Sequence, residues 1–165
     1  MNSITVNCPA KINLTLEIVN KREDGFHNIK SIMQTISLYD TLIIKVGEGD
    51  GEILLSGNSS EIPYNEKNLV YRAAELFYRE TGINNVRTEI YIDKNIPISA
   101  GLAGGSSDAA GTIFGLNELL GHPLKTMHKL CETLGSDLNV CLEGGSILAT
   151  SRGEVIKKLK PVKSK

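Results

Sequence analysis

Alternating hydrophobic and polar positions run through the first third of the chain, with the two-residue period of half-buried β-strands. In one such segment Leu14, Leu16 and Ile18 occupy every second position. We expect a hairpin between the first two strands and a break at Tyr39-Asp40 between the third and the fourth. The strands predicted on this basis are residues 3–8, 12–19, 33–38, 41–46 and 52–56.

The apolar spacing changes to three and four residues after Asn68, which is typical of helices. Asn68 is expected to cap a helix that continues to Gly82, and a strand at 88–93 follows. Two further helices are predicted to end at Gly121 and Gly135, and strands near 146–150 and 154–159 close the sequence. Strands followed by helices in one chain indicate an α+β fold.

A glycine-rich segment from Pro97 to Asp108 joins the strand at 88–93 to the second helix. Gly101, Gly104 and Gly105 allow positive φ and a close approach to a ligand, and the helix start offers N–H groups to an anion. The segment lacks the Gly-Lys-Ser/Thr of a Walker A loop and the spacing of a dinucleotide-binding loop. The alternative to a phosphate site is a tight turn whose Ser and Asp cap the helix, but three glycines and two serines exceed what capping requires.

Length and charge limit the classes of function. The 165 residues fit one domain that is large enough to fold around its own core. With 18 basic and 19 acidic side chains the net charge is −1, which disfavours binding to nucleic acid or to a membrane surface. The first residues lack the apolar core of a signal peptide and no apolar run has membrane-spanning length, so we expect a cytoplasmic location.

The cysteines and histidines show no pattern of metal ligands. Cys8, Cys131 and Cys141 are an odd set without a C-x-x-C pair, and we expect them to be small buried hydrophobic residues. His122 and His128 have no metal-ligand spacing with any cysteine, and we expect them in a loop and on a helix surface. The sequence therefore predicts no metal ligands.

Three polar clusters fall outside the hydrophobic framework. Lys11 and Asn13 take alternate positions of an otherwise apolar strand, so both point to the same face. The run from Asp24 to His27 is a turn, and its simplest interpretation is a hairpin tip with a partly buried Phe26. Asp137 follows the end of a helix, where a local Asx turn is the simplest interpretation.

These clusters and the glycine-rich segment together resemble the GHMP family of small-molecule kinases, in order and over nearly the whole chain. Pro9-Ala10-Lys11-Ile12-Asn13-Leu14 is similar to the family's opening motif, and the run from Gly101 to Ala110 to its ATP-phosphate loop. Asp24-Gly25-Phe26-His27 resembles its substrate-side turn, and Gly135-Ser136-Asp137 the segment with the catalytic aspartate. The resemblance implies the ribosomal protein S5 domain 2-like fold of the GHMP N-terminal domain, a mixed, mainly antiparallel sheet with helices on one side.

By this resemblance, the γ-phosphoryl group of ATP, with Mg²⁺, is transferred to the 2-hydroxyl of a diphosphocytidyl methylerythritol in non-mevalonate isoprenoid synthesis. Lys11 and Asp137 are the implied catalytic pair, in which Asp137 orients the hydroxyl and accepts its proton late in a loose transition state. Phe26 is expected to stack on the cytosine, His27 to hydrogen-bond to it, and Asn13 to lie near the substrate. The implied ATP-binding residues are Asn68, Lys94, Pro97, Gly101, Leu102, Ala103, Gly104, Gly105, Ser106 and Ser107. For Asn68 and Lys94 a helix N-cap and a strand-end surface lysine are the alternatives.

The sequence departs from the family pattern in three ways. Phe26 stands where the family usually has Tyr, and Asn139 where it usually has Pro. Family members are also nearly twice as long, and their second domain closes the cleft, whereas residues 1–165 correspond to the first domain. Two alternatives therefore stay open: a shortened domain that binds nucleotide or a partner without efficient catalysis, and a kinase for mevalonate or homoserine. Apolar surface exposed where a second domain would dock favours homodimers or partner binding.

Overall fold

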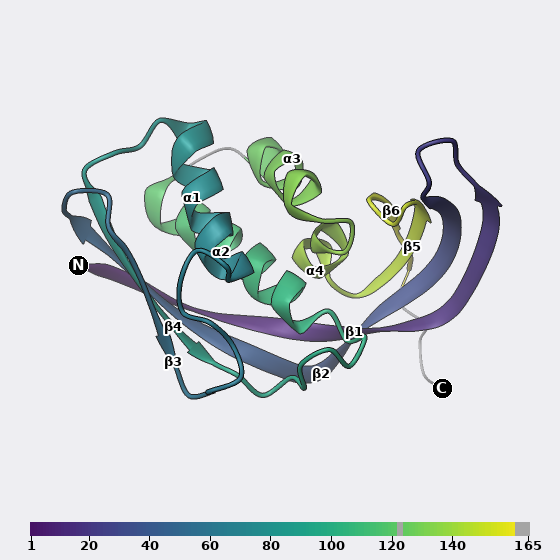
Figure 1. Ribbon diagram of the computed structural model, residues 1–165, viewed down its shortest axis with the longest axis horizontal. Helices are drawn as coiled ribbons and strands as arrows, with labels where there is room; N and C mark the ends of the chain where they lie inside the picture. The colour runs from purple at the N-terminus through teal and green to yellow at the C-terminus, as the bar shows by residue number, and fades with distance from the viewer. Residues whose placement is uncertain (122–123, 161–165) are drawn as a thin grey trace.

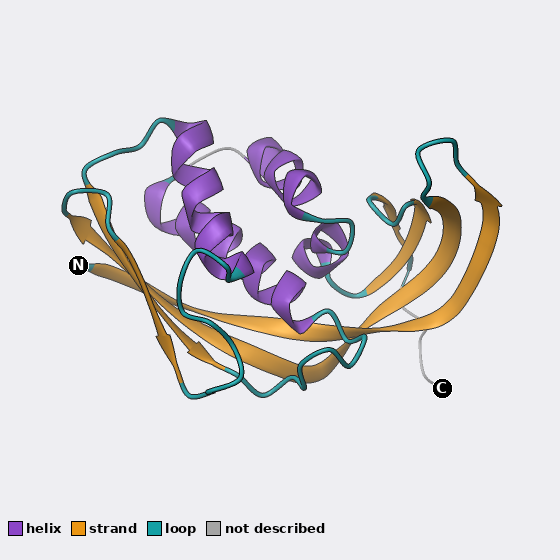
Figure 2. Ribbon diagram, viewed as in Figure 1, coloured by secondary structure: helices purple, strands orange, loops and turns teal. Residues whose placement is uncertain are grey.

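The computed structural model describes residues 1–121 and 124–160, in which a sheet and a layer of helices pack together (Figure 1). The six strands of the described residues belong to one mixed sheet, and the helices lie on one of its faces (Figure 2). The predicted α+β fold with helices on one side of the sheet is confirmed. In chain order the elements are β1 (Asn2–Lys21), β2 (His27–Glu48), β3 (Ile53–Gly57), α1 (Leu69–Thr81), β4 (Val86–Asp93), α2 (Gly104–Leu120), α3 (Leu124–Leu134), α4 (Leu138–Glu143), β5 (Ser146–Ser151) and β6 (Val155–Lys158).

Two long antiparallel strands, β1 and β2, run through the sheet. They pair along nearly their whole length, with irregularities at three points in β1, and the other edge of β2 pairs with β4 at one end and with β5 at the other. The predicted hairpin between residues 8 and 12 and the predicted break at Tyr39-Asp40 are therefore both wrong. Tyr39 pairs with Pro9 and Asp40 with Cys8, and other groups satisfy the Asp40 carboxylate, so a charged residue fits within the strand.

The main core lies between the sheet and helices α1, α2, α3 and α4. Two glycines allow helix α2 to lie very close to the sheet. A Cβ added at Gly111 would lie 2.3 Å from the Cys8 Sγ, and one added at Gly115 would lie 2.5 Å from the Ile44 Cδ1. This close approach places the first turn of α2 next to β1. The largest fully buried side chains of this core are Phe77, Leu42, Ile44, Ile90, Ile92, Ile113, Leu116, Leu138 and Val70.

The helix predicted after Asn68 is confirmed as α1. The Asn68 side chain accepts a hydrogen bond from the Val70 N–H, and Gly82 ends the helix in the left-handed conformation. Helix α2 begins at Gly104, earlier than its apolar face suggests. The sequence does not predict α4, because six residues are too few to show a helical period.

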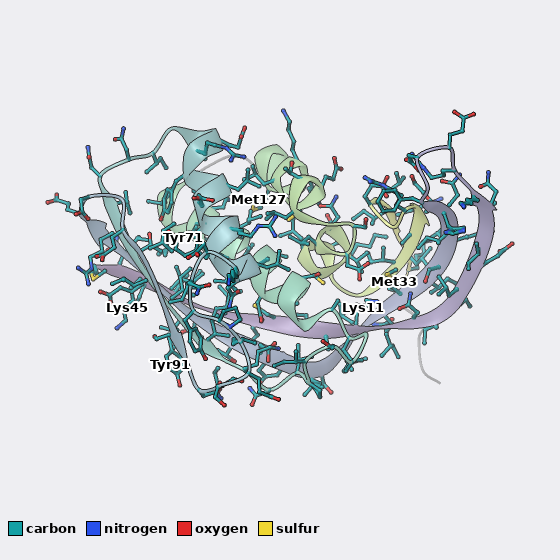
Figure 3. All side chains as sticks on the ribbon, in the orientation of Figure 1. Lys11, Met33, Lys45, Tyr71, Tyr91 and Met127 are labelled. Atoms are coloured by element: carbon teal, nitrogen blue, oxygen red, sulfur yellow. The ribbon has the colours of Figure 1, made fainter. Side chains whose placement is uncertain are left out.

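The far ends of β1 and β2 extend past the helices as a curved arm, which β5 and β6 widen (Figure 1). Helix α4 covers part of this arm through a small second apolar cluster. Leu14, Leu16, Ile18 and Val19 on β1 nevertheless stay 58% to 65% exposed. The alternation thus predicted the strand correctly but not a buried face, because the described helices pack over the other end of β1. On the body of the sheet, Lys45 and Tyr91 lie on the face away from the helices (Figure 3).

The three cysteines are buried and free, as the sequence predicts. Burial raises the pKa of the Cys131 and Cys141 thiols to about 12 and also raises the pKa of Cys8. These thiols are therefore protonated and unreactive at neutral pH. His128 lies partly exposed on α3, as expected, whereas the prediction for His122 falls outside the described residues. None of the described helices is both long and apolar enough to cross a membrane.

Candidate active site

The glycine-rich segment wraps around a cavity of about 310 Å³ at the start of α2. Ser99, Gly101 and Ala103 have φ values of 57°, 75° and 58°, so the backbone turns sharply at alternate residues. Ala103 is the N-cap of α2 and makes no side-chain hydrogen bond to the helix. The predicted alternative, a turn whose Ser or Asp caps the helix, is therefore wrong. Free N–H groups at a helix start behind a tightly turned loop form a concave site that suits a phosphate.

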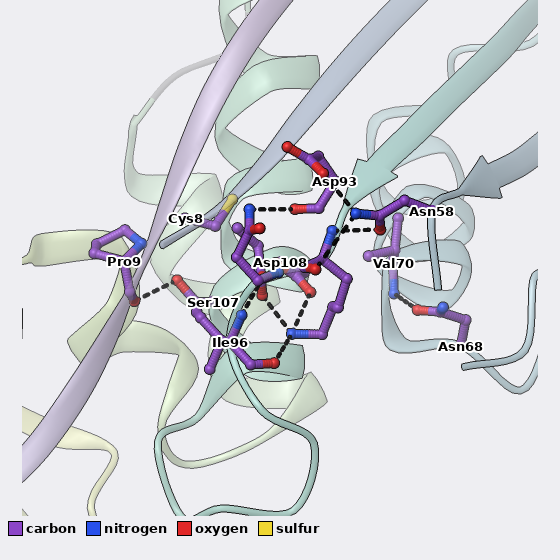
Figure 4. A network of polar contacts seen from close by, with 12 residues as sticks. Cys8, Pro9, Asn58, Asn68, Val70, Asp93, Ile96, Ser107 and Asp108 are labelled. Carbon is purple, nitrogen blue, oxygen red and sulfur yellow. Dashed lines mark hydrogen bonds and ion pairs between the residues drawn. The ribbon is translucent and has the colours of Figure 1, made fainter. Parts of the chain in front are cut away.

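Most of the residues predicted to bind ATP line this cavity. Asn68 precedes the lining Leu69, but its own side chain caps α1 and donates to the Pro63 carbonyl. Ser107 lies beneath the segment, where its hydroxyl donates to the Pro9 carbonyl at 2.8 Å (Figure 4). The structure therefore places these two side chains outside the cavity and the other predicted residues around it. Those residues are Lys94, Pro97, Gly101, Leu102, Ala103, Gly104, Gly105 and Ser106.

Lys94 belongs to a buried charge cluster, so the alternative of a surface lysine is wrong. Its side chain is 7% exposed, its Nζ bonds to the Asp40 carboxylate, and Asp108 Oδ2 lies 3.9 Å away. The same Asp40 carboxylate accepts the N–H groups of Asn95 and Ile96. Asp108 and Ile96 can be followed in Figure 4. The cluster joins β2 to the end of β4 and fixes the point where the glycine-rich segment begins.

Asp108 is the second acid of this cluster and is only 3% exposed. Burial and the neighbouring Asp40 carboxylate raise the pKa of Asp108 to about 8, against the opposite effect of Lys94. Its Oδ1 atom has no hydrogen-bond partner among the described residues. The raised pKa favours the protonated form of Asp108 at neutral pH, beneath the cavity at the glycine-rich segment.

Asp108→Asn is expected to flatten the pH dependence of stability. Folding raises the pKa of Asp108 from 3.8 to about 8. The contribution of protonated Asp108 to stability is therefore complete below pH 3.8 and is lost as the pH rises through about 8. Between about pH 5 and about pH 9, the free energy of unfolding should fall more in the wild type than in the variant, as urea titrations measure. Asp50→Asn, at an exposed carboxylate, is the control. Equal falls in all three proteins would contradict a protonated Asp108.

Lys11 and Asp137 meet beside the glycine-rich segment. The Lys11 Nζ lies 3.5 Å from the Asp137 Oδ2, and the two side chains are 8% and 34% exposed. The Lys11 N–H donates to the Leu102 carbonyl at 3.0 Å, which joins β1 directly to the segment. Figure 3 shows Lys11 on β1 below the helices, where the arm begins. The fold thus brings the predicted pair together at the edge of the cavity.

Helix α4 holds Asp137 in place, because Asp137 is its N-cap. Asn139, where the sequence resemblance leads us to expect proline, is 2% exposed. Its amide contacts the His128 Nδ1 and the Glu132 Oε1, each at 3.3 Å, and so ties the first turn of α4 to α3. A proline side chain would make no such hydrogen bonds.

Phe26 and His27 lie at the tip of the β1–β2 hairpin, at the end of the arm. Phe26 is 56% exposed, and the Arg152 guanidinium lies 5.2 Å from the centroid of its ring. The β5–β6 turn with Arg152 also reaches Asp137, because a Cβ on Gly153 would lie 3.8 Å from the Asp137 Oδ1. The β5–β6 turn therefore lies between Phe26, which is predicted to bind the base, and Asp137 of the predicted catalytic pair. Arg152 could not be predicted from the sequence, because its only local signal is an Arg-Gly turn between two strands.

Comparison with known proteins identifies the family and the fold of this chain. The family described as "GHMP kinases N terminal domain" matches residues 68–146, a range that includes the glycine-rich segment and Asp137. A solved 4-(cytidine 5'-diphospho)-2C-methyl-D-erythritol kinase has 35% identity and a TM-score of 0.79, over 94% of this chain and 55% of that one. The chain carries a GHMP kinase N-terminal domain. The mevalonate kinase of Methanococcus jannaschii, with 20% identity and a TM-score of 0.74 over 96% of this chain and 56% of its own, shares the fold.

Curated relatives match this GHMP kinase domain along nearly its whole length. The 4-diphosphocytidyl-2-C-methyl-D-erythritol kinase of Syntrophomonas wolfei is 46% identical over 159 residues, which are 95% of this chain and 55% of that protein. The kinase of the same name from Heliobacterium modesticaldum is 48% identical over 93% of this chain and 49% of its own length. The chain therefore spans about half the length of the curated relatives it matches.

Proposed function

We propose that this GHMP kinase domain is the ATP-binding half of a kinase that phosphorylates the 2-hydroxyl of 4-diphosphocytidyl-2-C-methyl-D-erythritol. The observation that carries the proposal is the Lys11–Asp137 ion pair, at 3.5 Å, beside the glycine-rich segment. Phosphoryl transfer to an alcohol needs groups that position the donor and a residue that orients the hydroxyl, and these lie together here. The names of the relatives with 46% and 48% identity support the choice of acceptor.

The glycine-rich segment and the first turn of α2 form the donor side. Their N–H groups would hold the β- and γ-phosphates, and because a helix dipole contributes only about 0.3–1 kcal/mol, the aligned N–H groups must supply more. Mg²⁺ bound with ATP neutralises charge on the phosphates. Among the described residues no group of three or more His, Cys, Asp or Glu could hold a metal.

Asp137 and Lys11 would act on the acceptor. The acceptor oxygen bonds to the γ-phosphorus as the bond to the β,γ-bridging oxygen breaks, ADP leaves, and the hydroxyl proton passes to the Asp137 carboxylate. Lys11 balances negative charge at the acceptor oxygen. The exposed ring of Phe26 offers a stacking surface for cytosine, and His27 offers one donor and one acceptor to the edge of the base.

An acceptor comparison tests this function. ADP release is measured with the cytidyl substrate, mevalonate and homoserine, for the product of the complete encoding reading frame and for the 165-residue chain alone. We expect turnover with the cytidyl substrate only, with its phosphorylated product identified by ³¹P NMR. Turnover with mevalonate or homoserine instead would show that the acceptor is wrong. ATP binding without turnover of any alcohol by the complete product would favour the nucleotide-binding alternative.

A further inference from the structure

A chain of three hydrogen bonds runs from Lys11 into the sheet. The Lys11 Nζ donates to the Asn13 Oδ1 at 2.8 Å, and the Asn13 Nδ2 donates to the Ser31 Oγ at 2.8 Å. Ser31 in turn donates its hydroxyl proton to the Thr15 carbonyl at 2.6 Å. Ser31 lies on β2 and is 0% exposed. Its buried hydroxyl is therefore the inner end of a chain that reaches the ammonium group beside Asp137.

The direction of this chain follows from the chemistry of its members. A serine hydroxyl has one proton, and a carbonyl oxygen can only accept, so the Ser31 proton goes to Thr15 and the Ser31 oxygen is left to accept. Only the NH₂ side of Asn13 can donate to that oxygen, which turns the carbonyl side of the amide toward Lys11. The opposite amide orientation would place NH₂ against an ammonium group, with two donors face to face.

An irregularity in β1 makes the chain possible. The pairing register of β1 and β2 shifts between Asn13 and Thr15, and after the shift Thr15 pairs with Ile32. The Thr15 hydroxyl accepts the Ile32 N–H at 3.0 Å, while its carbonyl accepts from Ser31. Such an extra residue in a strand re-aims the side chains beside it. Here Lys11 and Asn13 are both held on the side of the sheet where Asp137 lies.

We propose that Ser31 is a positioning residue, which sets the direction of the Asn13 amide and thereby holds the Lys11 ammonium against Asp137. The proposal rests on the kinase function proposed above. The ammonium group has three N–H bonds, and among the described residues its side-chain partners are Asn13 and Asp137, so one N–H remains for an oxygen of the transferred group. Without Ser31 the Asn13 NH₂ loses its hydrogen-bond acceptor in the sheet, so the amide plane can tilt and the ammonium loses a fixed direction.

Ser31→Ala is expected to lower kcat about 10- to 100-fold, because small errors in the position of a reacting group have effects of this size. The KM for ATP should stay unchanged, since Ser31 does not line the cavity at the glycine-rich segment. Ser31→Thr, which keeps the hydroxyl, should restore kcat, and Ser31→Cys, which is close in size but whose sulfur is a weak acceptor for the Asn13 NH₂, should not. The matched control is Thr88→Val, at a hydroxyl that is also 0% exposed on a strand and bonds to Tyr78. It should lower the melting temperature as much as Ser31→Ala but leave kcat unchanged.

NMR of the ¹⁵N-labelled chain provides a readout that does not depend on turnover. In the wild type the Asn13 side-chain NH₂ should exchange slowly with water, and Ser31→Ala should shift its signals and speed that exchange, whereas Thr88→Val should not. Unchanged Asn13 signals in Ser31→Ala, or an unchanged kcat in an active enzyme, would overturn the positioning role. If the Asn13 signals change but no variant or wild type transfers phosphate, the positioning of Lys11 is supported and only the kinase function fails.

Discussion

Asp137→Asn is expected to lower kcat for phosphoryl transfer about 10²- to 10⁴-fold, the usual contribution of a positioned acid–base group. Asparagine keeps the shape of the side chain but cannot take the proton of the acceptor hydroxyl, and it removes the charge 3.5 Å from the Lys11 ammonium. The KM for ATP should change little, because Asp137 does not line the cavity at the glycine-rich segment. Coupled measurement of ADP release on the complete gene product gives both constants.

Asp50→Asn serves as the control for Asp137→Asn, because it removes one carboxylate at an exposed site in the turn before β3. It should leave kcat and KM unchanged. If Asp137→Asn retained more than about a tenth of the wild-type kcat, the contribution of Asp137 would fall below that of an acid–base group. The catalytic assignment of the Lys11–Asp137 pair would then be wrong, whatever the acceptor.

Asp40→Asn is expected to lower the free energy of unfolding by about 3–5 kcal/mol, the usual effect of removing one partner of a buried ion pair. Asp40 is 0% exposed, and its carboxylate accepts hydrogen bonds from Lys94 and from the N–H groups of Asn95 and Ile96. Asparagine has one acceptor oxygen in place of two, so buried donors lose their partner. Urea titration at neutral pH measures the loss.

A double variant makes the Asp40 prediction sharper. Burial is the main cause of the raised Asp108 pKa and the Asp40 charge is the second; Asp40→Asn removes the second, so Asp108, 3.9 Å from the Lys94 Nζ, ionises more easily and partly replaces the lost partner. Asp40→Asn combined with Asp108→Asn should therefore lose more stability than the sum of the two single variants. If the losses of stability in the two single variants simply added up in the double variant, Asp40 and Asp108 would not share Lys94 as a partner. Asp93→Asn, at the partly exposed end of β4, is the control and should change stability by about 0.5–1 kcal/mol.

The α1 helix and the glycine-rich segment could be predicted because their signals are local. Asn68 and Gly82 mark the two ends of α1 and act within a few residues of themselves. The positive φ of Gly101 was likewise predicted from a short glycine-rich run, but the same prediction for Gly104 and Gly105 is wrong, because these two glycines already belong to α2 and Ala103 takes the left-handed conformation instead. The predicted break at Tyr39-Asp40 failed for the opposite reason. A charged residue in an apolar run looks the same whether its partner is water or a buried lysine more than fifty positions away.

By itself the sequence determined the α+β class, most of the strands and helices, and the residue types able to hold a phosphate and to orient a hydroxyl. Each of these depends on periodicity or on a short motif. Only the tertiary structure decided which polar groups meet. The pairing of β1 with β2 places Ser31 behind Asn13 and Lys11, and the packing of α4 brings Asp137 to the same point. Such contacts join residues that are distant in the chain, so their free energy depends on burial and register, which only the folded chain establishes.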